Sequence, residues 1–108
     1  DAVETHDCFT ISEYAALDHL GLTAPGESWK AVEDGRIELG GALPVNPSGG
    51  LLAAGHPVGA TGVRMLWDAT RQVTGTAGDC QVDGARRVAT LNLGGSLTTV
   101  ATFVVGRG

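Results

Sequence analysis

His56 is the residue whose setting most clearly indicates chemistry. It stands between a glycine-rich stretch and Pro57, which suits the first position of a helix expected to end at Gly75. The positive end of a helix dipole disfavours an imidazolium ion, and a neutral imidazole is able to accept a proton. A lone histidine is more often structural than catalytic, so the residue types alone leave both roles open.

A second candidate group lies near the beginning of the chain. His6 ends an expected strand over residues 2–6, and Cys8 stands between that strand and an expected helix over residues 11–20. A thiol directly before a helix is in a position that favours the thiolate, whereas a buried cysteine often acts as a small apolar residue. His6, Cys8 and His56 lack the Cys-x-x-Cys or His-x-x-x-His spacing of a metal centre, so no metal is expected.

Glycines gather over residues 40–62, in the expected loop and at the start of the second expected helix. Seven of the 17 glycines fall in this region, at positions 40, 41, 49, 50, 55, 59 and 62. Backbone amides that converge in such a loop can bind a phosphate or an oxyanion. Gly55 is followed by His56-Pro57 rather than by Lys-Ser or Lys-Thr, so a nucleotide-binding P-loop is excluded. A tight packing loop remains the alternative reading of the glycines.

The sequence pattern predicts the elements that position these residues. They form an α/β domain in the order β-α-long glycine-rich loop-α-β-β. The loop spans residues 22–56 and includes one helical turn over 27–33. Strands over 85–93 and 97–105 are joined by the hairpin loop Gly94-Gly95-Ser96. The last strand is apolar on both faces, and a sheet covered on both sides needs more layers than 108 residues supply.

The helix after Pro57 is expected to bury one apolar side, made of Val63, Met65, Leu66 and Trp67. Arg64 and Asp68 are four residues apart, which predicts an ion pair along that helix. In the first helix, Thr10 and Glu13 have the spacing of a capping box.

Composition limits the partners of this chain. The 108 residues fit one domain over 1–108, and 7 basic against 12 acidic side chains give a net charge of −5. This balance argues against nucleic acid and anionic membrane surfaces as main partners. No apolar run reaches the ~20 residues of a membrane span. Cys8 and Cys80 are too few for a disulfide framework and fit a reducing, cytoplasmic location.

Three motifs resemble the C-terminal part of the thiolase superfamily. The stretch from Asn46-Pro-Ser-Gly-Gly to Gly-His-Pro-Val-Gly-Ala-Thr-Gly62 is similar to the Asn-x-x-Gly-Gly…Gly-His-Pro-x-Gly-Ala-[ST]-Gly signature of thiolases. His6-Asp7-Cys8-Phe9 resembles the His-Asp-Cys-Phe motif of sterol carrier protein thiolases, where ordinary thiolases carry Asn-Glu-Ala-Phe. Asn92-Leu93-Gly94-Gly95 falls where ordinary thiolases carry Cys-x-Gly.

The resemblance implies a role for each matching residue. His56 would activate a nucleophilic cysteine and help bind the thioester oxygen, and His6 would help form an oxyanion hole. Cys8 would be the acid or base at the α-carbon of the substrate, the role that the missing Cys-x-Gly cysteine has in ordinary thiolases. Gly94 would supply a backbone donor near the nucleophile. The resemblance also implies two substrate-binding positions, Asn46 and Gly55.

The resemblance covers nearly the whole chain but only about the last quarter of a typical thiolase. It implies part of the layered α/β/α/β/α thiolase fold and an acyltransferase similar to acetyl-CoA acetyltransferases, acting by Claisen condensation or by thiolysis of 3-oxoacyl-CoA. A coenzyme A thioester would be the substrate, with no cofactor. The nucleophilic cysteine would belong to the remainder of the thiolase or to a second chain, in a homo- or hetero-oligomer, and these 108 residues alone would be inactive.

Two alternatives to the acyltransferase remain. One is a thiolase-fold lyase that cleaves a coenzyme A thioester by a retro-aldol reaction. The other is a non-catalytic, thiolase-like subunit. The absence of a nucleophile in 1–108 favours the subunit for this chain in isolation, whereas His6, Cys8 and His56 favour an enzyme.

Overall fold

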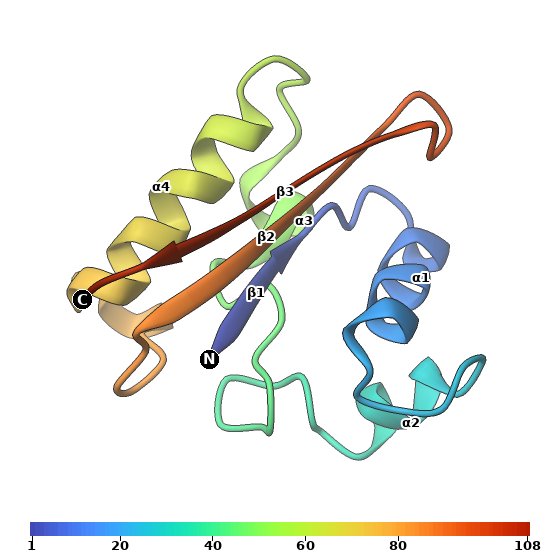
Figure 1. Cartoon of the computed structure of the whole chain (residues 1–108), viewed down its shortest axis with the longest axis horizontal. Coiled ribbons are helices and arrows are strands. Elements are labelled where there is room, and N and C mark those ends of the chain that lie inside the picture. Colours follow the sequence, from blue (N-terminus) through green and yellow to red (C-terminus); the bar gives the residue numbers. More distant parts are fainter.

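A three-stranded sheet forms the centre of the computed structural model, which describes residues 1–108 (Figure 1). Strands β1 (Ala2–Thr5), β2 (Arg87–Gly94) and β3 (Thr99–Gly106) lie in this order. β1 is parallel to β2, which is antiparallel to β3. Side chains alternate between the two faces of the sheet, so Val88, Thr90 and Asn92 share one face. The predicted α/β class and the C-terminal hairpin are present.

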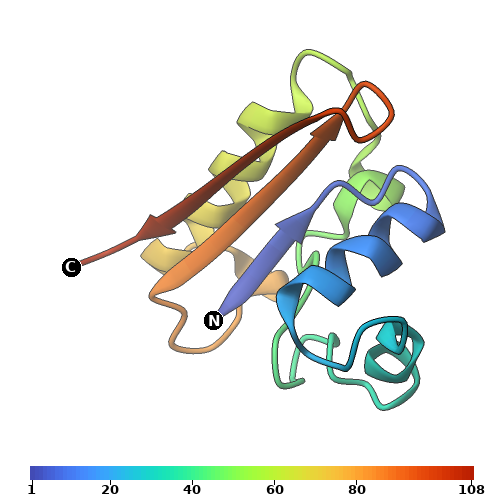
Figure 2. The ribbon, with the colours of Figure 1, turned by 45° about the vertical axis from the view of Figure 1, so that its right-hand side comes forward.

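Four helices surround the sheet: α1 (Thr10–Leu20), α2 (Ser28–Glu33), α3 (Gly50–Ala54) and α4 (Thr61–Thr74). A short 3-10 turn follows at Gly78–Cys80. Figure 2 shows α4 behind the sheet and α1 in front of it, with α1 packed on α2. None of these helices combines the length and the apolar character needed to cross a membrane.

The core lies between α4 and the sheet and is made largely of small side chains. It consists of Ala2, Ala69, Val73, Val82, Ala85 and Val88, with Val105 packed against it. The buried positions of α4 recur at intervals of about four residues: Thr61, Met65, Ala69, Gln72 and Val73. This spacing is the one that places side chains on a single helix face.

The predicted buried side of α4 is wrong in part. Met65 is fully buried, but Val63 is 71% exposed and Trp67 is 63% exposed. Small residues such as Ala69 allow the helix to approach the sheet closely, so the bulky side chains lie on the side that faces away. The predicted pair of Arg64 and Asp68 is present, with 3.6 Å between Nε and Oδ2.

The segment predicted as a loop over 22–56 is more ordered than expected. It contains α2, close to the predicted turn over 27–33, and α3, and Val45 forms a parallel bridge with Val3. Closely spaced glycines and prolines limit each element to a few residues, and these short elements have no apolar periodicity that would reveal them.

Two predicted helix starts also need correction. Pro57 does not begin α4, because its carbonyl accepts the amides of Ala60 and Thr61 in a separate turn, and the helix begins at Thr61. The N-cap of α1 is Phe9 rather than Thr10, and no side chain caps that helix. The capping box is therefore absent, although the predicted end of α1 at Gly21 is correct, with φ 70°.

β3 forms an edge of the sheet and is exposed along almost its whole length. Val100, Phe103 and Val104 are 55%, 53% and 70% exposed, and they lie on both faces of the strand. The strand has the apolar faces that its sequence shows, but residues 1–108 supply little that covers them. In native proteins, a long apolar edge strand of this kind is usually paired with another strand or covered by other residues.

Candidate active site

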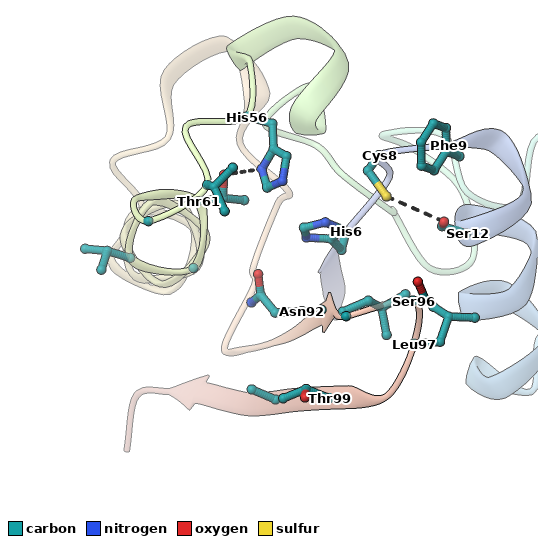
Figure 3. Close-up of a pocket in the computed structure, with 18 of the residues that line it drawn as sticks. His6, Cys8, Phe9, Ser12, His56, Thr61, Asn92, Ser96, Leu97 and Thr99 are labelled. Carbon is teal, nitrogen blue, oxygen red and sulfur yellow. Dashed lines mark hydrogen bonds between the residues drawn. The ribbon is translucent and has the colours of Figure 1, made fainter.

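A groove of about 920 Å³ opens where β1 and β2 end (Figure 3). His6 and Cys8 reach it from the connection between β1 and α1, and His56 reaches it from the connection between α3 and α4. Asn92 and Gly94 line it from the end of β2. The fold therefore brings together the three predicted catalytic residues and the predicted backbone position Gly94.

His6, which is buried, and His56, which is exposed, meet in the part of the groove that we call its floor. Their ring centroids are 4.7 Å apart, and the rings meet edge to face at 88°. Burial, and then the neighbouring His56, lowers the pKa of His6 below its ordinary value of 6.5, while Asn92 and Asp7 act in the opposite direction. The buried Nδ1 of His6 has no hydrogen-bond partner in the chain. His6 is therefore held mainly as a neutral ring at neutral pH.

Thr61 orients the ring of His56. Its Oγ1 lies 2.7 Å from Nδ1 of His56 and donates to the carbonyl of Pro57 at 3.2 Å. The contact occupies Nδ1 of His56, and its direction depends on the tautomer of the ring. In the tautomer with its proton on Nδ1, Thr61 accepts that hydrogen bond while it donates to Pro57, and Nε2 is the nitrogen that can accept a proton.

Cys8 lies at the rim of the groove, one residue before the N-cap of α1. Its thiol is 3.6 Å from the hydroxyl of Ser12, a buried side chain in the first turn of α1. Phe9 flanks the thiol and is 71% exposed. Cys8 is thus accessible to a ligand and touches one polar neighbour.

Sequence reasoning missed Ser12 and Thr61. Thr61 occupies the [ST] position of the Gly-His-Pro-x-Gly-Ala-[ST]-Gly signature, five residues after His56, so the motif itself contained the signal. Ser12 is four residues after Cys8, but this spacing predicts a contact only if the helix begins between the two residues, as it does.

Polar side chains from β1 fix the loop that leads to α3. The Asn46 amide accepts from the backbone of Thr5 at 2.7 Å and donates to the Thr5 hydroxyl at 3.1 Å. Ser48 donates to Glu4 through its hydroxyl at 2.7 Å and through its amide at 3.2 Å. Burial raises the pKa of Glu4 above its ordinary value of 4.5, against the effect of these two bonds.

The two predicted substrate-binding positions do not line the groove. The side chain of Asn46 is bound to Thr5, and Gly55 ends α3 with φ 77°. Both residues shape the path of the chain toward His56. Their contact with a substrate stays a prediction.

The sides of the groove are apolar. Its lining includes Phe9, Ile11, Val58, Val63, Leu66, Leu97 and Phe103. Cys80 lies outside it, so Cys8 is the only thiol in the groove. No three histidine, cysteine or acidic side chains are close enough together to hold a metal ion. The arrangement offers a base, an acid or base thiol and polar donors beneath a surface suited to an apolar chain.

Comparisons with known proteins agree with the motifs. The family model described as thiolase C-terminal domain-like matches residues 1–107. An acetyl-CoA acetyltransferase of Methanothermobacter thermautotrophicus is 46% identical over 107 residues, which cover 99% of this chain and 28% of that protein. Sterol carrier protein 2 of Gallus gallus is 39% identical over 107 residues, covering 98% of this chain and 20% of that protein.

A solved structure, the Ltp2-ChsH2(DUF35) aldolase, has the same arrangement. Its TM-score is 0.80 at 32% identity, and the match covers 97% of this chain and 26% of that one. The chain thus spans about a fifth to a quarter of the length of the relatives it matches. The predicted resemblance and the predicted fold class are confirmed.

Proposed function

The chain belongs to the thiolase C-terminal domain-like family, and on that basis we propose that it is the C-terminal part of an acyl-CoA acyltransferase of the sterol carrier protein thiolase type. The observation that carries the proposal is the meeting of His6, Cys8 and His56 in one groove. The reaction is thiolysis of a 3-oxoacyl-CoA or the reverse Claisen condensation. The relative named acetyl-CoA acetyltransferase supports this reaction class.

The proposed chemistry begins with a cysteine that lies outside residues 1–108. Nε2 of His56 accepts the proton of that thiol, while the Thr61 hydroxyl, 2.7 Å from Nδ1, accepts the hydrogen bond of the other ring nitrogen in this proposal. The thiolate attacks the carbonyl carbon of the acyl donor, and negative charge develops on the carbonyl oxygen. Hydrogen-bond donors around such an oxygen lower the barrier of the reaction. His6 is one such donor in this proposal, because its ring lies beside that of His56.

Cys8 acts at the α-carbon, in the second half of condensation and in the first half of thiolysis. In condensation, its thiolate removes an α-proton from the second thioester, and the resulting carbanion attacks the acyl-enzyme and expels the cysteine thiolate. In thiolysis, the Cys8 thiol returns that proton to the carbanion released when the carbon–carbon bond breaks. The thiol lies at the open rim, where a substrate can reach it.

The proposed enzyme requires further polypeptide. The nucleophile and most of the coenzyme A site come from the remainder of the thiolase or from a second chain, in a homo- or hetero-oligomer. The charge of −5 is consistent with this division, because few basic side chains here could meet the phosphates of coenzyme A. A cytoplasmic location fits two free cysteines.

The Cys8→Ser variant of the complete protein tests the proposal. We expect it to become acylated by acyl-CoA, as seen by intact mass, but to lose exchange of the α-protons of the substrate in heavy water. Cys80→Ser is the matched control and should retain both steps, because Cys80 lies outside the groove. Loss of acylation with retained exchange would mean that Cys8 is the nucleophile rather than the acid or base at the α-carbon. Unchanged exchange and turnover would mean that Cys8 has only a structural role.

A retro-aldol lyase is the second candidate, because the similar solved structure is an aldolase. Incubation with a 3-hydroxyacyl-CoA in the absence of free coenzyme A separates the two reactions. A lyase releases an aldehyde or ketone and a shorter acyl-CoA. A thiolase needs a 3-oxoacyl-CoA and consumes free coenzyme A. His6 supports thiolysis, because the resemblance assigns that position to the oxyanion hole of thiolases.

A further inference from the structure

Asp7 lies between two groove residues and reaches the segment that carries the third. Its Oδ1 accepts a hydrogen bond of 2.7 Å from the amide of Leu51, near the start of α3. The carbonyl of Leu51 in turn accepts the amide of Gly55 at 2.9 Å, and His56 follows directly. Two hydrogen bonds therefore connect the His6–Cys8 segment to the backbone that ends at His56.

The peptide group between Gly50 and Leu51 is held at both ends. Asp7 accepts its N–H, and Nη1 of Arg64 in α4 donates to its carbonyl oxygen at 3.0 Å. The two side chains have opposite charges, each suited to the end of the peptide dipole that it meets, and hydrogen bonds to charged groups are about twice as strong as neutral ones. One peptide plane is thus clamped between a carboxylate and a guanidinium.

Gly50 is adapted to this clamp. Its φ is 61°, a conformation that favours glycine, and a Cβ built at this position would overlap with the carboxylate of Asp7. The carboxylate is therefore packed against the backbone as well as hydrogen-bonded to it. A side chain at position 50 would force the two segments apart.

We propose that Asp7 is a positioning residue, whose carboxylate, opposite Arg64, sets the distance between the His6–Cys8 segment and His56. The inference rests on the proposed function of those three residues. Ring centroids 4.7 Å apart leave little room for movement of either segment. A displacement of ~1 Å in such a site lowers a rate by about 10²-fold.

Two substitutions in the complete protein separate the hydrogen bond from the charge. Asp7→Asn keeps an oxygen that accepts the Leu51 amide but removes the charge, and Asp7→Ala removes both. Asp18→Ala is the matched control, because Asp18 also accepts a backbone amide, that of Gly26 at 3.1 Å, and does not line the groove. Each variant is measured by kcat and KM for thiolysis and by hydrogen–deuterium exchange of residues 49–57.

For Asp7→Ala we expect kcat to fall by ~10- to 100-fold with little change in KM, and exchange of residues 49–57 to become faster. Asp7→Asn should restore most of kcat and the slow exchange, and Asp18→Ala should change neither. Equal losses of kcat in Asp7→Asn and Asp7→Ala, with exchange unchanged, would show that the charge acts directly and would overturn the proposal. An unchanged kcat in Asp7→Ala would overturn it as well.

The exchange measurement keeps this inference apart from the proposed function. If the complete wild-type protein has no thiolase activity, the acyltransferase assignment fails. Faster exchange at 49–57 in Asp7→Ala, reversed in Asp7→Asn, would then still support the clamp. Unchanged exchange in Asp7→Ala would overturn the clamp whatever the activity.

Discussion

The floor and the rim of the groove are built in different ways. The floor, which carries His6 and His56, is fixed by side-chain hydrogen bonds between β1 and the loop before α3, by the bond between Asp7 and the Leu51 amide in α3, and by the contact between Thr61 and His56. The rim consists of exposed apolar side chains with no partner across them: Phe9, Ile11, Val58, Val63, Leu97 and Phe103. The geometry of the two histidines is therefore set within these 108 residues, whereas under the proposed function the enclosure of a substrate requires other polypeptide.

This difference has a physical origin. Buried polar groups must be hydrogen-bonded, so Glu4, which is fully buried, requires Ser48 to lie in one place. Apolar side chains have no such directional need, and they gain free energy from any surface that removes them from water. The bonds that fix the backbone of the floor form within these 108 residues, whereas the buried Nδ1 of His6 and the apolar rim have no partner in them.

The largest effect should come from separating this chain from the polypeptide that covers its rim. Residues 1–108 expressed alone should have no thiolase turnover and should associate through the rim and β3, because a large apolar surface stays exposed. Sedimentation velocity and a thiolysis assay measure the two outcomes. A stable monomer with turnover would refute both the division of labour between floor and rim and the location of the nucleophile outside this chain.

Breaking the floor at His56 should have the next largest effect. In the complete enzyme, His56→Ala should lower kcat by about three orders of magnitude, because the base for the nucleophile and a polar group near the thioester oxygen are lost together. His19→Ala is the control, since His19 is exposed on α1 and contacts only the carbonyl of Ala15. Near wild-type thiolysis in His56→Ala would rule out the assignment.

A smaller effect should be seen in how the stability of the floor depends on pH. The pKa of Glu4 is raised above 4.5 by burial, so the folded state binds a proton more tightly than the unfolded state. The free energy of unfolding should therefore be highest below pH 4.5 for this group and should decrease as the pH rises through the raised pKa. Glu4→Gln should remove that part of the pH dependence.

Thermal unfolding of the complete protein between pH 4 and 8, with wild type and Glu4→Gln compared at each pH, measures this contribution. The comparison is needed because burial also raises the pKa of Glu13 and Asp68, which change stability in the same direction. A difference between wild type and Glu4→Gln that is constant with pH would contradict the raised pKa.

Local motifs predicted the content of the site better than its support. His6, Cys8 and His56 were found because each stands in a short pattern with its own chemistry, and the family signature linked those patterns. The bond from Asp7 to Leu51 left no trace in the sequence, because a contact across 44 positions produces no periodicity. Position 50 offered only a glycine, without the carboxylate that explains it.

On α4, the sequence in part predicts the wrong buried side chains. Val63 and Trp67 were assigned to the core because bulky apolar residues at helical spacing are usually buried. The structure assigns the packing against the sheet to Ala69 and Val73 instead. The assumption that failed for α4 is that the surface that buries its apolar side chains lies within these residues. For β3 the sequence predicts the opposite, a strand that residues 1–108 cannot cover, and the strand is exposed.

The parallel run of β1 beside the loop before α3 has a consequence for the order of folding. Thr5 and Asn46, Glu4 and Ser48, and Asp7 and Leu51 are each separated by 41 to 44 positions. Whichever bond forms first must close a loop of that length, but the other two then close rings of only a few residues, and the entropy of closure depends on loop length. The three bonds should therefore form almost together. The floor would then assemble in a single cooperative event late in folding, so that a chain with a half-built groove is hardly populated.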